Sequence, residues 1–103
     1  MALINSTFQR ILDSYEPMFA NYRNLLPAHQ YSLLQAIAVE NGIDKPTSGT
    51  FIHKYRLTSA SSVKSSLKAL DDKEMIVRTG TSWQVYDVFF SRWLEYHFGG
   101  RSF

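Results

Sequence analysis

The chain has 103 residues, a length at which one hydrophobic core forms and a second is hard to assemble, so we expect a single domain. Its composition, 45% hydrophobic and 19% charged, is that of a globular protein and not of a disordered or fibrous one. A net charge of +2 permits an anionic partner without a dense basic surface, and the absence of cysteine excludes disulfides and thiolate metal sites.

The first predicted element is a long amphipathic helix. Apolar residues recur at helical spacing from Phe8 to Leu26, which predicts a helical extension over about residues 3–25. Pro17 lies inside this pattern and removes one backbone hydrogen bond. We therefore expect either a kink or two abutting helices at that point.

The next elements form a predicted helix-turn-helix. Pro27 is suited to open a helix whose apolar positions run to Ala38, with Gly42 as its C-terminal cap. A short helix from Gly49 to about Tyr55 and a longer one from Ser59 to about Asp71 follow. A tight turn of three residues separates them, as in helix-turn-helix motifs.

Beyond this motif the hydrophobic period changes from helical to that of strands. Met75–Arg78 and Ser82–Tyr86 are predicted strands joined through Thr79–Thr81, which together form a β-hairpin. The order of elements predicts a mainly α fold with a small hairpin, namely a winged helix-turn-helix.

The last predicted element is a helix from Val88 to about Phe98, capped by Asp87. We expect residues 1–98 to form the winged helix-turn-helix domain, with about 87–98 as its C-terminal helix. Residues 99–103 are expected to form a flexible tail.

Many positions in this order of elements also match one family. They are Leu26-Pro27, Gln30, Leu33–Ala38, Phe51–Tyr55, Leu57–Ser59, Ser62-Val63, Leu67, Leu70, Met75-Ile76 and Tyr86–Leu94. This set resembles the C-terminal winged-helix region of prokaryotic AAA-type (STAND-like) ATPases. In that family a strand ending in Asp-Pro opens a helix with an apolar-apolar-x-x-Trp-Leu signature. Here Val88 replaces the proline after Asp87, and Phe89–Leu94 retain the remainder.

The resemblance implies that the chain is a fragment or a stand-alone relative of a larger nucleotide-driven protein. The sequence itself has no Gly-x-x-x-x-Gly-Lys-Ser/Thr run, and a phosphate-binding loop needs those glycines so that backbone N–H groups converge on the anion. We therefore expect a non-enzymatic chain without a cofactor, whose parent protein hydrolyses ATP.

The helix from Ser59 to Asp71 is the candidate DNA-binding element. Its period turns one set of residues inward, namely Ala60, Val63, Leu67 and Leu70. The set turned outward is Ser61, Lys64, Ser65 and Lys68. Lysine neutralises phosphate and serine can bond phosphates or base edges, so this face suits DNA. The alternative is a solvated face of small polar residues.

Other charged residues bear on the same hypothesis. Arg78 in the hairpin, with Lys54 and Arg56 at the end of the short helix, is placed to flank a phosphate backbone. Acidic residues after the candidate helix, Asp71, Asp72 and Glu74, would repel phosphates nearby. Any DNA contact should therefore favour the N-terminal half of that helix.

The last helix carries more aromatic surface than one face of a small domain easily hides. We expect Phe89, Trp93 and Leu94 to pack in the core against the first helix. Another set, Phe90, Tyr96 and Phe98, would form a protein-interaction patch if exposed together.

Two functions follow from these features. The first is a regulatory or partner-docking module, bound to the ATPase domain of its parent or to another protein, that also contacts double-stranded DNA. The alternative is the DNA-binding domain of a transcription regulator.

The histidines lack zinc-ligand spacing and no apolar run has transmembrane length. We therefore expect a cytoplasmic protein that binds no metal and no membrane.

Overall fold

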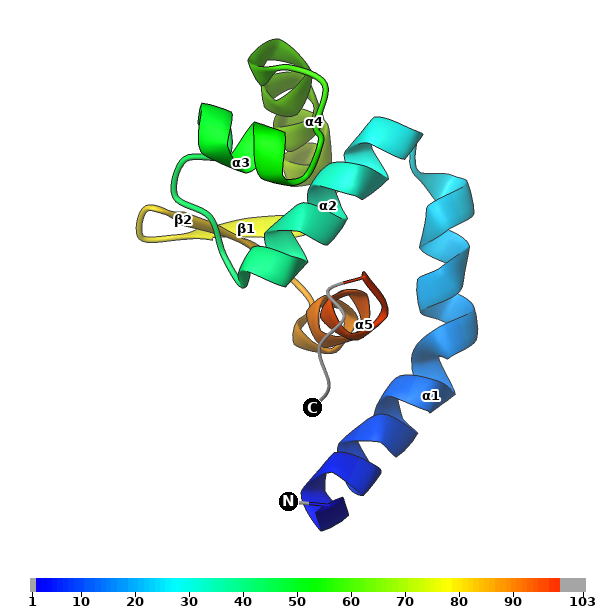
Figure 1. Cartoon of the computed structure of the whole chain (residues 1–103). Helices are drawn as coiled ribbons and strands as arrows, with labels where there is room; N and C mark the ends of the chain where they lie inside the picture. The colour runs from blue at the N-terminus through cyan, green and yellow to red at the C-terminus, as the bar shows by residue number, and fades with distance from the viewer. Residues whose placement is uncertain (1, 99–103) are drawn as a thin grey trace.

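The structure, a computed structural model, describes residues 2–98, and within them the side chains of residues 10, 11 and 13–98. Its elements are α1 (Ala2–Leu25), α2 (Ala28–Glu40), α3 (Gly49–Lys54), α4 (Ala60–Asp72), β1 (Ile76–Thr79), β2 (Ser82–Val85) and α5 (Val88–Phe98). This arrangement confirms the predicted mainly helical fold with a two-stranded hairpin (Figure 1). The expected tail, 99–103, lies outside the described residues.

α2 is the central helix of the fold, in contact with α4, α5 and β2 (Figure 1). Its buried residues occupy most of its circumference: Tyr31, Leu33, Leu34, Ala36, Ile37 and Ala38. A helix that is apolar on nearly all sides is stable in water only when other elements cover it. α2 ends at Asn41, which adopts the left-handed conformation (φ 57°), one residue before the predicted cap Gly42.

α3 and α4 form the helix-turn-helix, and serine side chains begin both helices. The Ser48 hydroxyl accepts a hydrogen bond from the Phe51 N–H (3.3 Å), and the Ser59 hydroxyl accepts one from the Ser62 N–H (3.1 Å). Between the helices Arg56 has a φ of 55°, a left-handed conformation that is uncommon outside glycine and asparagine. This turn sets the angle at which α4 leaves α3.

α1 is one helix that passes through Pro17, so the predicted alternative of two abutting helices is wrong. Figure 1 shows that its axis bends along its length. After the proline, aromatic side chains of α1 pack against α5 and stabilise the second half of the helix. The Phe19 ring lies 5.1 Å from that of Phe90, and the Tyr22 ring lies 4.8 Å from the same residue.

The hairpin is antiparallel, with Ile76 opposite Val85 and Arg78 opposite Trp83. β1 is shifted by one residue toward the turn relative to its predicted range, and β2 ends one residue earlier than predicted. The connecting turn places Gly80 at a φ of 65°. Ile43, in the segment after α2, pairs with Trp83 through N···O distances of 3.0 and 2.9 Å. This bridge ties the hairpin to the central helix.

α5 packs between α1 and α2 (Figure 1). Of its first residues, Phe89 was predicted to be buried and Phe90 to be exposed, and the structure shows the reverse. Asp87 caps it as predicted, since its carboxylate accepts hydrogen bonds from the backbone N–H groups of Phe89 (2.9 Å) and Phe90 (3.2 Å). Phe90 is only 2% exposed and Phe89 is 38% exposed. Phe90 shares the buried face because Trp93 and Leu94, three and four residues later, both point into the core.

No described helix combines the length and apolar character needed to span a bilayer.

Candidate functional site

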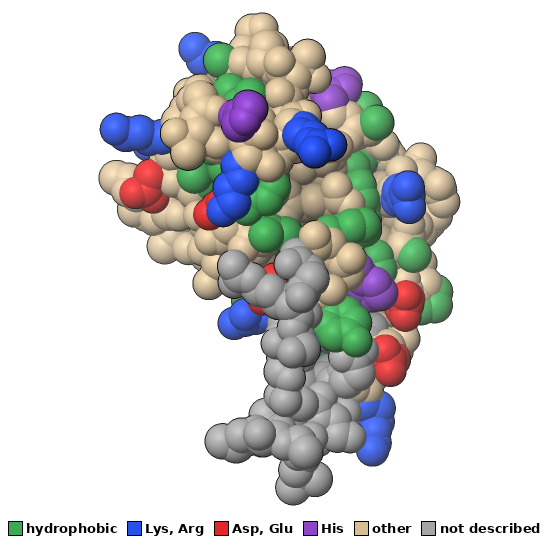
Figure 2. Space-filling model, in the orientation of Figure 1, with side chains coloured by type: hydrophobic (Ala, Val, Ile, Leu, Met, Phe, Trp, Pro, Cys, Tyr) green, Lys and Arg blue, Asp and Glu red, His purple; other side chains and the backbone are tan. Residues whose placement is uncertain are grey.

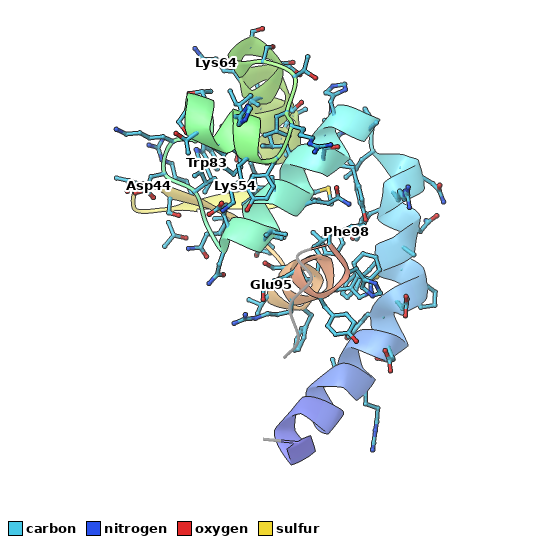
Figure 3. The ribbon with its side chains drawn as sticks, viewed as in Figure 1. Asp44, Lys54, Lys64, Trp83, Glu95 and Phe98 are labelled. Atoms are coloured by element: carbon cyan, nitrogen blue, oxygen red, sulfur yellow. The ribbon has the colours of Figure 1, made fainter. Side chains whose placement is uncertain are left out.

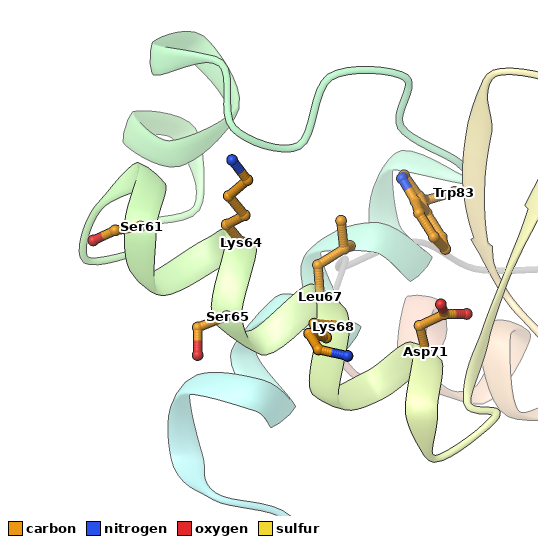
Figure 4. A pocket seen from close by; sticks show the side chains of 7 residues that line it. All are labelled: Ser61, Lys64, Ser65, Leu67, Lys68, Asp71 and Trp83. Carbon is orange, nitrogen blue, oxygen red and sulfur yellow. The ribbon is translucent and has the colours of Figure 1, made fainter.

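A groove of about 710 Å³ lies between α4 and the hairpin (Figure 4). Its lining residues are Ser61, Lys64, Ser65, Leu67, Lys68, Asp71 and Trp83. Every α4 residue predicted to face outward is among them, and all of those are exposed. The structure therefore gathers the predicted α4 face along one concave surface.

The floor of the groove is apolar. Trp83 of β2 faces Leu67 of α4 across it, and both side chains are half-buried (Figure 4). The backbone bridge to Ile43 holds Trp83 in place. Because Arg78 is directly opposite Trp83 in the hairpin, both side chains lie on the same face, with the guanidinium 5.6 Å from the indole centroid. Arg78 therefore lies beside the groove.

The two lysines of the groove differ in whether an acidic side chain lies near them. Lys64 makes no ion pair with any side chain in the described part of the chain, whereas Lys68 pairs with Asp72 at 3.3 Å. Both partners of that pair are well exposed, so water screens it and it contributes little energy. Asp71 lies at the C-terminal end of the groove. The acidic residues Asp71 and Asp72 therefore lie toward the C-terminal end of α4, and Lys64 lies nearer its N-terminal end.

Figure 2 shows Lys and Arg side chains spread singly over the visible face, without one continuous basic patch. Local geometry around the groove therefore matters more than the overall field of the protein.

Lys54 takes part in a separate cluster at the end of α2. Its ammonium lies 2.7 Å from the Glu40 carboxylate, which also accepts a hydrogen bond from the Tyr55 hydroxyl at 2.7 Å. The hydrogen bond to Glu40 raises the pKa of Lys54, and burial followed by the same carboxylate raises the pKa of Tyr55. Lys54 is thus engaged within the molecule. Sequence reasoning missed Glu40 because this contact joins two separate helices.

Arg56 also lies away from the groove. Its side chain lines a second and smaller pocket, beside the turn between α3 and α4. The predicted DNA-contacting residues therefore form two groups. Those on α4 and Arg78 of the hairpin lie in or beside the groove, whereas Lys54 and Arg56 lie elsewhere.

The predicted protein-interaction patch of Phe90, Tyr96 and Phe98 is wrong for Phe90, which is buried against Phe19 and Tyr22. Tyr96 and Phe98 are exposed at 38% and 44%. Figure 3 shows Lys64 and Trp83 on the side of α4 and the hairpin, and Phe98 beside α5, toward α1.

A different pair of aromatic rings is exposed where α1 meets α5. Tyr15 is 44% exposed, and its ring stacks on that of Phe89 at 6.3 Å. Tyr15 is one of the residues between Phe8 and Leu26 whose helical spacing predicts the first helix. Its position one turn before buried Phe19 is the signal that places it beside α5.

Within residues 2–98, no three His, Asp or Glu side chains come together in a cluster that could hold a metal ion.

Residues 17–96 match a family described as a probable winged helix domain. The matched segment begins inside α1, covers α2 to β2 in full and ends near the last residue of α5. No curated protein and no solved structure matches the chain significantly.

Proposed function

This chain belongs to the family of probable winged helix domains, and we propose that it is a non-catalytic domain that binds double-stranded DNA through the groove between α4 and the hairpin. The observation that carries the proposal is the position of Arg78. The hairpin places its guanidinium over Trp83, which lines the groove together with Lys64 and Lys68 of α4. A helix face and a hairpin cation on one side of a winged helix can contact a major groove and its flanking phosphates together.

The composition of the α4 face favours binding to the DNA backbone over base reading. Lys64 and Lys68 supply positive charge for phosphates, and Ser61 and Ser65 supply hydroxyl groups for phosphates or base edges. Side chains that read bases bidentately, such as Arg, Asn and Gln, do not occur at these outward positions. We therefore expect weak discrimination between DNA sequences.

We also propose that the domain works in the C-terminal region of an AAA-type ATPase, where the rest of the protein hydrolyses ATP. The resemblance over Leu26 to Phe98 supports this context. In such a protein, DNA contact by this domain would report to, or be regulated by, the nucleotide state of the ATPase.

The test is binding of the chain to mixed-sequence duplex DNA, followed by fluorescence anisotropy at low and near-physiological salt. Salt-sensitive binding is expected, because phosphate contacts release counterions. The Lys64→Glu/Lys68→Glu variant should lose at least tenfold in affinity at low salt. The matched control is Arg10→Glu/Arg23→Glu, which changes the net charge equally on α1, away from the groove. Equal losses in both variants, or no binding at low salt, would refute the proposal.

A second candidate function is docking onto a protein, for which the ATPase region of the same protein is the expected partner. The exposed, stacked pair Tyr15 and Phe89 supports it, because aromatic residues are enriched at the centres of protein interfaces. A Phe89→Glu substitution should then weaken association with the ATPase region in size-exclusion chromatography and leave DNA binding unchanged. Unchanged association would count against this candidate.

A further inference from the structure

A small pocket of about 60 Å³ lies beside α4 on a different side from the groove, and six of the nine residues that line it are polar. It is enclosed by the start of α2, the turn after α3 and the first turns of α4. The polar residues that line it are His29, Ser32, Arg56, Thr58, Ser62 and Ser66. Most of them carry hydroxyl groups, and none of the lining residues in the described structure is acidic.

Ser66 is the unusual member of this set. It is 1% exposed, and its hydroxyl has no hydrogen-bond partner among the described residues. Buried polar atoms in folded proteins are nearly always paired, so an unpaired one that lines a pocket indicates a missing partner. Ser62 lies one turn earlier on the same face of α4 and lines the same pocket.

The pocket also has a positive electrostatic environment. Arg56 contributes a guanidinium from the turn between α3 and α4, where its side chain lines the pocket. His29 stands in the first turn of α2 and Ser32 at the start of the second, and the N-terminus of this helix has no side-chain cap. The first N–H groups of an uncapped helix carry a partial positive charge and favour an anion nearby.

We propose that this pocket binds a single phosphate group. Arg56 supplies the charge, and Ser66, Ser62 and Thr58 donate hydroxyl hydrogen bonds to the phosphate oxygens, so that the buried Ser66 hydroxyl becomes paired. A volume of about 60 Å³ has room for a few water molecules or one tetrahedral oxyanion, but not for a base and sugar as well. The phosphate is either free in solution or part of a nucleic-acid backbone. The inference does not rest on DNA binding by the groove.

The test is a titration of the ¹⁵N-labelled chain with inorganic phosphate at constant ionic strength, followed by amide chemical shifts. Saturable shifts are expected at His29, Arg56, Ser62 and Ser66. They should require at least tenfold more phosphate in Ser66→Ala, which removes only the hydroxyl group, and in Arg56→Gln. The control is Arg10→Gln, which removes the same charge from an exposed position on α1 and should leave the titration unchanged.

Duplex DNA then distinguishes the two sources of phosphate. If DNA shifts the same amides and inorganic phosphate competes with it, the pocket holds a backbone phosphate. If DNA leaves these amides unmoved while inorganic phosphate shifts them, the pocket holds free phosphate. Both results support the site, and the second can occur even if the groove binds no DNA. The absence of saturable phosphate shifts, or equal shifts in wild type and Ser66→Ala, would overturn the inference.

Discussion

α2 and α4 are helices of 13 residues each, and they use their side chains in opposite ways. α2 is buried around most of its circumference and its N-terminus has no side-chain cap, so tertiary packing holds it in place. α4 has a hydroxyl cap, and its buried face is narrow, with Val63, Ser66 and Leu70. The comparison teaches that one helix supplies the core of the domain, which leaves the other free to present a surface to partners.

The largest effect expected from this difference concerns the core of α2. Leu34 is fully buried, so Leu34→Ala should lower the free energy of unfolding by about 2–5 kcal/mol, because it removes apolar contacts and leaves a cavity. Urea denaturation measures the change. Ser65→Ala, on the exposed face of α4, should stay within about 0.5 kcal/mol of wild type. Similar losses in both variants would contradict the division of roles.

A smaller effect is expected at the start of α4. Ser59→Ala removes the hydroxyl that accepts the Ser62 N–H, and should cost about 1 kcal/mol of stability. Thermal unfolding followed by circular dichroism is the measurement. Pro27→Ala at the start of α2 provides the comparison, since no side-chain cap is lost there. If it destabilises the protein more than Ser59→Ala, capping is not what distinguishes the two helices.

A substitution in the turn before α4 should raise the stability of the protein instead of lowering it. Arg56→Gly places glycine at a φ of 55° and should stabilise the fold, by up to about 1 kcal/mol, because the left-handed conformation strains other residues. The same variant should bind inorganic phosphate more weakly than wild type. Calorimetric unfolding with and without phosphate measures both effects. Loss of stability in the absence of phosphate would show that Arg56 makes a structural contribution in this turn.

The smallest change in stability is expected at Lys64. Lys64→Ala should leave unfolding within about 0.5 kcal/mol of wild type, because the side chain is exposed and has no ion-pair partner among the described residues. The salt dependence of DNA binding should become less steep by about 0.9, the contribution of one phosphate contact. Anisotropy titrations at several salt concentrations give this slope. An unchanged slope would place Lys64 outside the DNA contact.

Much of the fold could be predicted from hydrophobic period and local capping. The period of α4 placed Lys64 and Lys68 outward, and Asp87 was recognised as the cap of α5. These features depend on residues within one or two turns of each other, which the sequence displays directly.

The errors arise where the sequence pattern is ambiguous or a contact is remote. Phe89 and Phe90 are equally apolar, and the buried one is Phe90, which shares a helix face with Trp93 and Leu94 and packs against Phe19 of α1. Ala60 was expected to point inward and is exposed, whereas Ser66 occupies an inward position that a hydrophobic pattern assigns to solvent. The backbone bridge between Ile43 and Trp83 joins distant segments, and no local signal announces it.

The placement of the two tryptophans has a spectroscopic consequence. Trp93 is 5% exposed in the core, and Trp83 is half-buried at the groove, with the Arg78 cation over its ring. The indole of Trp83 should therefore respond to a quencher such as iodide and to occupation of the groove, and Trp93 only to unfolding. With Trp93→Phe, the intrinsic fluorescence of this unlabelled protein becomes a reporter of what enters the groove.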